Sequence, residues 1–387
     1  MKNIVLVDRN EKALLPFTYT RPVSLIRIGI LTIQEKWEKR LNVSSSFLTQ
    51  DYLSAKFPCE LKDLNWFINA SILPTKSLEL AIQKLGPNQS LYVDETWIAS
   101  CGKELSQATN QLKVDLKVNQ LCGVSDIFRL NEQEINADFD LLTKGRTSQE
   151  PGSFCQIFGD YPLFIEEGAK MNAVTINTTD GPVYIGKDAE LMEGTLIRGP
   201  FAACEHSTIK MGAKIYGGTT VGPYSKVGGE VSNSVIFGFS NKGHDGFLGN
   251  SVLGEWCNLG ADTNNSNLKN NYSNVRVWNY EQEEYADTGL QFCGLIMGDH
   301  SKTGINTMLN TGTVVGICAN IFGGGFPDKH IPSFGWGGAD RMVEFRLKKS
   351  YEVAEKMMSR RGVSFTVEDE AIFEHVFNES AKYRMSF

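Results

Sequence analysis

The amino-acid sequence predicts three parts: an N-terminal α/β domain, a left-handed parallel β-helix, and a short C-terminal helical tail. Strand-like and helix-like segments alternate over about the first 115 residues, aliphatic residues recur at every sixth position from Ile185, and two amphipathic helical segments follow Pro332. From these observations we expect domains at residues 1–150, 151–330 and 331–387.

The first part alternates between two kinds of segment. NIVLVD, LNWFINA and SLYVDETWIAS have strand composition, whereas SLIRIGILTIQEKWEKRL and LPTKSLELAIQKLG have helical spacing of their apolar residues. A further helix is expected in SDIFRLNEQEINADFDLLTKG, and the Ser-, Pro- and Gly-rich stretch GRTSQEPGS has the composition of a linker. The alternation favours a layered α/β domain.

The middle of the chain carries a hexapeptide repeat. A period of six describes short parallel strands that stack into a β-helix, because an amphipathic helix needs apolar residues three and four apart and a hairpin array needs a period of two. We expect two interruptions, at 228–247 and 264–295, where side chains leave the helix. The ladder runs through Ile185, Leu191, Ile197, Ala203, Ile209, Ile215, Val221 and Val227, resumes at Leu253 and Leu259, and continues with Met297, Thr303, Leu309, Val315 and Ile321.

Composition limits the classes of function. The chain is 41% hydrophobic and 21% charged, with a net charge of −7 and no long Lys/Arg run, which argues against a nucleic-acid surface. No run of 18 apolar residues predicts a membrane span, and the apolar start is too short for a signal peptide, so we expect a cytoplasmic protein. Eight cysteines without a CxxC motif or Cys/His cluster predict reduced thiols rather than disulfides or a zinc site.

One histidine stands out in the segment NKGHDGFLGNSVLGEWCNLGADTNNSN. His244 lies among glycines and asparagines at the end of the first interruption. An imidazole with a pKa near 6.5 can accept a proton at neutral pH, so His244 is a candidate general base; the alternative is an exposed loop histidine without a role. Lys226, Asn241 and Lys242 lie near it in sequence and could hold a phosphate group, or could be solvated turn residues.

This segment and the repeat resemble the acetyltransferase half of the bifunctional enzymes that make UDP-N-acetylglucosamine. That family joins a glucosamine-1-phosphate acetyltransferase to an N-acetylglucosamine-1-phosphate uridyltransferase. The stretch LLPFTYTRPVSLIRIGILTIQEKW is similar to a variant group with a short, atypical nucleotidyltransferase-like domain. The resemblance implies that His244 is the base for N-acetylation, that acetyl-CoA is the acyl donor, and that backbone N–H groups near the glycines stabilise the tetrahedral oxyanion.

The resemblance also implies an assembly and further contacts. It implies a homotrimer with active sites between neighbouring β-helices, across which the segment 264–295 would reach. It places Asn267 at the acyl site. Phe247 and Leu268 stand where the family has tyrosines, so the substrate contacts that those hydroxyl groups make are in doubt for this chain.

The N-terminal domain departs from ordinary sugar nucleotidyltransferases. Those enzymes open with a G-x-G-T-R loop that holds the triphosphate and use an aspartate for Mg²⁺, whereas VDRNEKALLPFTYTRP contains no glycine and Ala70 stands where a glycine-aspartate pair is expected. Arg21 and Arg27 could grip phosphate, and Asp8 or Asp94 could hold a metal ion, but each could also be a surface charge or a cap. Active uridylyl transfer with Mg²⁺ and a degenerate domain that binds a nucleotide-sugar or positions the trimer are both open.

Three hypotheses from different classes follow. The first is acetylation of glucosamine-1-phosphate, with or without uridylyl transfer to the product. The second is a nucleotidyltransferase for another sugar-1-phosphate, such as glucose-1-phosphate with dTTP, in which the β-helix serves only assembly and His244→Ala leaves activity intact. The third is a noncatalytic trimeric binding module, for which neither acetyl-CoA nor a nucleotide would raise the melting temperature.

Overall fold

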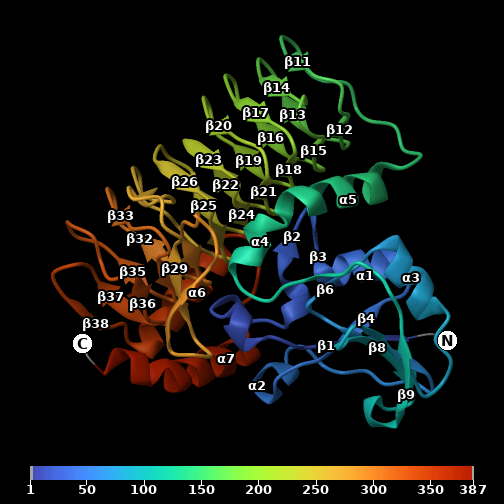
Figure 1. The fold of residues 1–387 in the computed structure, drawn as a ribbon. Coiled ribbons are helices and arrows are strands. Elements are labelled where there is room, and N and C mark those ends of the chain that lie inside the picture. Colours follow the sequence, from blue (N-terminus) through green and yellow to red (C-terminus); the bar gives the residue numbers. More distant parts are fainter. Residues whose placement is uncertain (1–2, 386–387) are drawn as a thin grey trace. The chain divides into compact units, whose positions relative to one another are not determined.

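The computed structural model describes residues 3–385, which form two compact units (Figure 1). Unit 1 contains Met1–Leu14, Thr20–Ile26 and Leu31–Gly123, and unit 2 contains Leu15–Tyr19, Arg27–Ile30 and Val124–Phe387. No helix in the described part of the chain is long and apolar enough to cross a membrane.

Unit 1 is an α/β domain with a six-stranded mixed sheet. The central strands β1 and β5 are parallel to each other and buried along their whole length, as their continuous apolar runs require. Helices α1 (Ile33–Leu41), α2 (Asp51–Ser54) and α3 (Lys76–Gln83) accompany the sheet. In spatial order the strands are β4 (Ser45–Leu48), β1 (Asn3–Val7), β5 (Asn65–Asn69), β8 (Thr96–Gly102), β7 (Gln89–Val93) and β9 (Asn110–Lys113).

Two expected elements of unit 1 differ in extent. The segment SLYVDETWIAS forms the hairpin β7–β8 rather than one strand, because Asp94 adopts a left-handed φ of 50° and turns the chain. The long helix expected from Ser24 begins only at Ile33. Thr32 and Glu35 form a capping box there, which satisfies the free N–H groups of the first turn and fixes the start of α1.

Unit 2 is dominated by the left-handed parallel β-helix, whose strands form three faces (Figure 1). Face 1 contains β11 (Gln156–Phe158), β14 (Thr175–Asn177), β17 (Leu196–Arg198), β20 (Lys214–Ile215), β23 (Glu230–Ser232) and β26 (Phe247–Gly249). Face 2 contains β12 (Leu163–Ile165), β15 (Val183–Ile185), β18 (Phe201–Ala203), β21 (Thr219–Val221), β24 (Val235–Ile236), β27 (Val252–Leu253), β31 (Ile296–Met297), β34 (Val314–Val315) and β36 (His330–Ile331). Face 3 contains β13 (Lys170–Met171), β16 (Glu190–Leu191), β19 (Thr208–Ile209), β22 (Lys226–Val227) and β25 (Asn241–Lys242).

The hexapeptide ladder forms the core of the β-helix. Every position predicted for it lies in one continuous buried cluster except Thr303, which is also buried and shares a hydrogen bond of 2.7 Å with the hydroxyl of Thr263. Leu191 pairs with Ile209 and Ile209 with Val227, so each coil advances by eighteen residues, or three hexapeptides. The periodicity of the sequence therefore identifies the inward-facing side chains correctly.

The first expected interruption, 228–247, is wrong. The β-helix continues through it, because Ile215 pairs with Val231 and Val221 with Ile236, and both new partners are buried. These coils advance by sixteen and fifteen residues instead of eighteen. Shortened turns shift the phase of the repeat without breaking the stack of coils. A fixed period of six therefore no longer identifies the inward-facing residues in this stretch.

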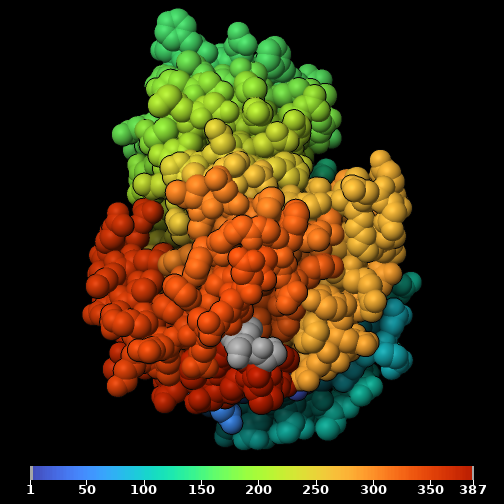
Figure 2. All heavy atoms as spheres, turned by 90° about the vertical axis from the view of Figure 1, so that its left-hand side faces the viewer, coloured from blue at the N-terminus to red at the C-terminus, as the bar shows by residue number. Residues whose placement is uncertain are grey.

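The second interruption, 264–295, is a real excursion. It contains β28 (Asn264–Asn265) and the antiparallel hairpin β29–β30 (Arg276–Asn279 and Glu284–Asp287), and it appears in amber as a ridge beside the later coils in Figure 2. Face 2 nevertheless stays continuous, because Val252 pairs directly with Ile296. The later coils add β32 (Lys302–Thr303), β33 (Met308–Leu309), β35 (Asn320–Ile321), β37 (Gly335–Gly337) and β38 (Met342–Glu344).

Helices flank the β-helix within unit 2. The expected linker helix forms as α4 (Ser125–Arg129) and α5 (Asn131–Thr143), and the Nδ2 of Asn131 donates hydrogen bonds to Gly218 O and Thr220 Oγ1 at 2.7 and 3.0 Å. These contacts group residues 124–150 with unit 2, whereas we expected them in the first domain. The tail forms the two expected helices, α6 (Leu347–Ser359) and α7 (Val367–Glu379).

Candidate functional site

A lysine occupies a core position two residues before His244. Lys242 pairs in register with Val227, and through it continues the inward-facing row of Leu191 and Ile209 on face 3. Its side chain is only 2% exposed, and burial lowers the pKa of its ammonium group to about 8. The Nζ atom donates a hydrogen bond of 2.6 Å to the backbone carbonyl of His244. This bond gives the buried ammonium group a partner and also holds the following turn in place.

His244 lies in the turn between β25 of face 3 and β26 of face 1. The residue is exposed, and within residues 3–385 its imidazole makes no hydrogen bond, ion pair or ring contact. The other four histidines are engaged by neighbouring side chains: His206 with Tyr224, His300 with Trp256, His330 with Trp278, and His375 with Glu379. Both ring nitrogens of His244 are therefore open to a ligand.

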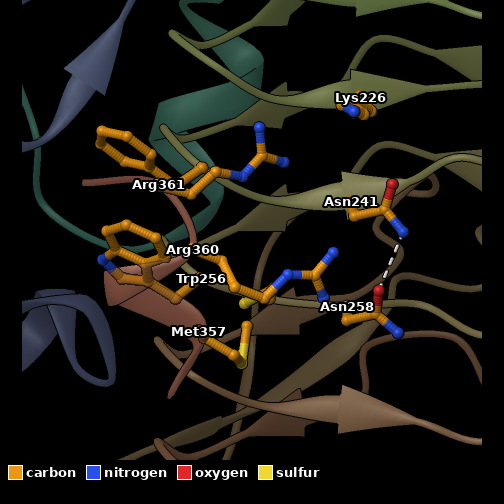
Figure 3. A pocket seen from close by; sticks show the side chains of 9 residues that line it. Lys226, Asn241, Trp256, Asn258, Met357, Arg360 and Arg361 are labelled. Atoms are coloured by element: carbon orange, nitrogen blue, oxygen red, sulfur yellow. Dashed lines mark hydrogen bonds between the residues drawn. The ribbon is translucent and has the colours of Figure 1, made fainter. Parts of the chain in front are cut away.

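A pocket of about 360 Å³ opens on face 3 (Figure 3); Asn241 of β25 lines it, whereas His244 is not among its lining residues. Lys226, Asn241 and Asn258 supply one side of it, from three successive coils. Arg360 and Arg361, at the end of α6, extend their guanidinium groups toward that side. The remaining lining residues are Phe239, Trp256, Cys257 and Met357.

The pocket has a net positive charge. Burial is the main cause that lowers the pKa of Lys226, the neighbouring Arg361, Lys210 and Arg360 lower it further by charge repulsion, and the Glu190 carboxylate partly offsets them. No acidic residue lines the pocket, and neither guanidinium group has an ion-pair or hydrogen-bond partner among the described residues. Three cations in one pocket favour a ligand that carries phosphate.

Two rings that line the pocket, Phe239 and Trp256, belong to a longer stack of rings. In five successive coils the same corner residue has a left-handed φ between 54° and 62°, and neighbouring rings lie 4.3 to 6.1 Å apart between centroids. On the opposite side, Asn241 donates a hydrogen bond of 2.8 Å to the side-chain oxygen of Asn258. These contacts fix the wall before a ligand binds. The stacked residues are His206, Tyr224, Phe239, Trp256 and His300.

The residues expected near His244 lie in different places. Lys226 and Asn241 line the pocket, whereas Lys242 does not, because its core position turns the ammonium group inward; an open phosphate contact is the wrong role for it. Asn267 lies beyond β28, where its Nδ2 donates a hydrogen bond of 2.8 Å to Asn250. A Cβ added to Gly249 would touch both Asn267 and Phe247, so these two side chains adjoin at the face 1 end of the His244 turn.

The sequence analysis missed the two arginines of α6. In the sequence, these arginines appear only as an Arg-Arg pair that precedes Gly362 at the end of a helical pattern. Nothing in that pattern relates the pair to a strand more than one hundred residues earlier. Met357 was missed for the same reason, because its proximity depends on how α6 packs against the coils. Trp256 and Asn258 lie on the coil that follows Asn241, and they were missed because shortened turns shift the repeat there.

The charged residues proposed for nucleotide binding are already engaged. Arg21 and Arg27 are buried, and Arg27 donates to the carbonyl of Ile30 within unit 2. The Asp8 carboxylate accepts hydrogen bonds from Thr49 Oγ1 at 2.5 Å and from the Val23 N–H at 2.9 Å, and burial raises its pKa to about 7. Asp94 is exposed in the β7–β8 turn. The described residues contain no cluster of three or more His, Cys, Asp or Glu side chains that could hold a metal ion.

Known proteins show similarity to both halves of the chain. Residues 4–147 match the family model described as "Sugar nucleotidyl transferase". A "Bifunctional sugar-1-phosphate nucleotidylyltransferase/acetyltransferase" of Sulfurisphaera tokodaii is 27% identical over 67% of this chain and 61% of its own length. A "Bifunctional protein GlmU" of Synechococcus elongatus is 24% identical over 56% of this chain and 46% of its own, and one of Methanococcus aeolicus is 30% identical over 33% and 26%.

These findings define a class of protein. The chain combines a domain that matches the sugar nucleotidyl transferase model with a hexapeptide-repeat β-helix. The chain is similar to bifunctional sugar-1-phosphate nucleotidylyltransferases/acetyltransferases, and the family model covers residues 4–147. It spans about half to three fifths of the length of the first relatives that it matches.

Proposed function

We propose that unit 2 transfers the acetyl group of acetyl-CoA to the amine of glucosamine-1-phosphate. The observation that carries this proposal is the imidazole of His244, which is exposed and unengaged at a turn whose backbone is held by the buried Lys242. A base needs an open nitrogen atom and a fixed position, and this turn supplies both.

In the proposed reaction, His244 accepts a proton from the ammonium group of the sugar. His244 passes this proton to solvent, and the neutral amine attacks the thioester carbonyl. The C–N bond forms, His244 takes the second proton from the nitrogen, and the tetrahedral intermediate collapses as the C–S bond breaks. The CoA thiolate leaves and takes up the proton from the imidazolium group, so the base is restored. Backbone N–H groups of the glycine-rich turn 243–249 would stabilise the oxyanion.

The pocket on face 3 supplies the binding energy in this scheme. Lys226, Arg360 and Arg361 would hold phosphate, and Asn241 would add a neutral hydrogen-bond donor or acceptor. Asn267, on the other side of the His244 turn, would contact the acyl group. Lys242 positions His244 through its carbonyl and does not touch the substrate in this scheme.

We propose a homotrimer as the working assembly. Face 1 exposes Ile157 and Phe158 of β11, Leu196 of β17, and Tyr216 directly after β20, each between 42% and 52% exposed. Such an apolar surface supports association with a second copy of the chain. The excursion 264–295 would then reach a neighbour, and the complete site would need more than one chain. We also propose a cytoplasmic location, since the acyl donor must be present where the enzyme works.

Sugar-1-phosphate nucleotidyl transfer is the second candidate function. The family match over residues 4–147 favours it, with UTP or dTTP as the nucleotide and Mg²⁺ as the metal ion. It would couple to the first reaction if the acetylated sugar phosphate were the acceptor. A noncatalytic trimeric module remains the third hypothesis.

Release of the CoA thiol tests the main proposal. Purified protein is mixed with acetyl-CoA and glucosamine-1-phosphate, and wild type is compared with His244→Ala. We expect the variant to lose roughly 10²- to 10⁴-fold in kcat, as for a missing general base, while folding and assembly persist. His375→Ala is the matched control, because His375 is exposed on α7 and pairs with Glu379. Equal rates for wild type and His244→Ala, or no turnover with a panel of amino sugars, would refute the assignment.

A further inference from the structure

The strand that follows the His244 turn is joined to the next coil by side chains. β26 pairs with β23 on one side, but the sheet of face 1 ends there, and β28 of the next coil pairs with β33 instead. The Phe247 N–H donates a hydrogen bond to Asn264 Oδ1 at 2.8 Å, and the Gly249 N–H donates to Asn265 Oδ1 at 3.0 Å. Two side-chain amides of β28 therefore accept the bonds that strand carbonyls accept in a regular ladder.

Asn264 accepts the first N–H group after His244 that has a partner. Within the described residues 3–385, the N–H groups of residues 243–246 make no hydrogen bond, whereas that of Phe247 does. The carbonyl groups of the turn are held by Lys242 and by neighbouring coils. Asn264 therefore holds the turn from its C-terminal side, as Lys242 holds it from its N-terminal side.

Asp262 fixes the orientation of the Asn264 amide. The Asn264 Nδ2 donates to the backbone oxygen of Asp262 at 2.9 Å and to its carboxylate Oδ1 at 3.2 Å. Both acceptors need the NH₂ end of the amide, so the Oδ1 end faces the Phe247 N–H. The backbone N–H of Asp262 in turn donates to the carbonyl of Asp245 at 3.0 Å, so the same residue also contacts the His244 turn. These bonds form one connected network.

We propose that Asn264 is a positioning residue for His244. The inference rests on the proposed acetyl transfer, in which His244 is the base. Asn264 makes no hydrogen bond to the imidazole; it holds the Phe247 N–H, and the turn then presents the imidazole in one position. A misplacement of about 1 Å can lower a rate about 100-fold, so the loss of this anchor should reduce kcat.

Asn264→Leu removes the amide and keeps the approximate size of the side chain. We expect kcat to fall roughly 10- to 100-fold while each KM stays within about twofold of wild type, because no substrate contact is removed. Asn177→Leu is the matched control, since Asn177 is also half-buried on face 1 and accepts the Thr179 N–H at 2.8 Å through Oδ1, but lies on β14, far from the turn. An unchanged kcat in Asn264→Leu, or a change in KM alone, would overturn the proposal.

An exchange of two side chains tests the network itself. In Asn264→Asp, the introduced carboxylate can still accept the Phe247 N–H but lies beside the carboxylate of Asp262, and we expect kcat to fall because the like charges move apart. Asp262→Asn/Asn264→Asp reverses the bond between these side chains and keeps an acceptor for Phe247, so kcat should return to within about threefold of wild type. A double variant as slow as Asn264→Asp would contradict the proposal.

Two NMR signals separate this proposal from the acetyl-transfer proposal, because neither requires turnover. The Phe247 amide should exchange its hydrogen roughly tenfold faster in Asn264→Leu than in wild type. The imidazole resonance of His244, assigned by its loss in His244→Ala, should shift in Asn264→Leu and return in the double variant. If wild type shows no turnover, the acetyl-transfer proposal fails and these signals alone decide the role of Asn264. Unchanged amide exchange or an unmoved imidazole resonance overturns that role whatever the turnover.

Discussion

The Nζ atom of Lys242 lies 2.6 Å from the backbone oxygen of His244, and this bond links the core of the β-helix to the turn that presents the candidate base. Lys242 reaches this position because a shortened coil places it opposite Val227, in a row of aliphatic side chains. A charged residue in such a row costs stability, and here the charge serves to fix the turn.

Replacement of this buried charge should stabilise the protein and lower its activity. We expect Lys242→Met to raise the free energy of unfolding at pH 7 by on the order of 1 to 3 kcal/mol, because the variant buries no charge. Acetyl transfer should fall because the His244 turn loses its anchor. Urea unfolding and the CoA thiol assay measure the two effects, with the exposed Lys348→Met as the control.

The same lysine gives a specific dependence on pH. Its folded-state pKa of about 8 lies below the ordinary 10.5, so the unfolded chain binds more protons between these values. Wild type should therefore gain stability as the pH rises from 8 to 10.5, by on the order of 3 kcal/mol, whereas Lys242→Met should lack this gain. Parallel stability profiles for the two proteins would show that the ammonium group is not desolvated.

His330 should make unit 2 sensitive to acid. Burial lowers the pKa of its imidazole to about 3, and the ring stacks on Trp278 with centroids 4.2 Å apart. The unfolded chain binds more protons between pH 6.5 and 3, so stability is lost as the pH falls below 6.5, by about 2 kcal/mol at pH 5. His330→Phe keeps a flat ring and should remove this part of the slope in urea unfolding, whereas the exposed His375→Phe should not.

The arginines of α6 should affect substrate affinity more than chemistry. Arg361→Gln and Arg360→Gln should each raise a KM for a phosphate-bearing substrate roughly tenfold, and the effect should shrink at high salt because screening weakens the contact. Their guanidinium groups are exposed, so the melting temperature should change little. Steady-state kinetics beside Lys348→Gln, which removes a charge from the same helix outside the pocket, checks this; a fall in kcat alone would exclude a role in binding.

A glycine after His244 should be essential for the shape of the turn. Gly246 has a φ of +120°, and an added Cβ would lie 2.3 Å from the carbonyl oxygen of Thr263. We expect Gly246→Ala to cost more than about 2 kcal/mol of stability and to abolish acetyl transfer, although no reacting group is removed. Gly212→Ala is the matched control, because Gly212 also has a positive φ of +68° but has open space around it, so about 1 kcal/mol is expected.

The sequence predicts the core of the β-helix better than its turns. Ladder residues such as Ile209 and Val315 are identified because each points inward at a fixed period. The period fails at Val231 and Lys242, since turns of different length shift the phase, and no local signal reports the length of a turn. His244 is recognised from its motif, but its freedom from neighbouring side chains is visible only in the structure.

The face 3 pocket could be predicted only in part for a related reason. Lys226 and Asn241 lie close to His244 in sequence, whereas Arg361 comes from a helix that follows the repeat. A pair of arginines at the end of an amphipathic helix is ordinary surface composition, so the sequence alone gives no reason to choose it.

The continuity of face 2 allows the excursion 264–295 to change in length. Val252 and Ile296 are adjacent rungs on that face although forty-three residues separate them, while face 3 crosses the same level through single bridges at Asn258 and the sheet of face 1 ends at β26. The strand pairing of face 2 therefore keeps the coils on the two sides of the excursion aligned. The excursion can lengthen, shorten or be exchanged during evolution without displacing the coils on either side, so new recognition segments can be acquired while the frame that aligns them is retained.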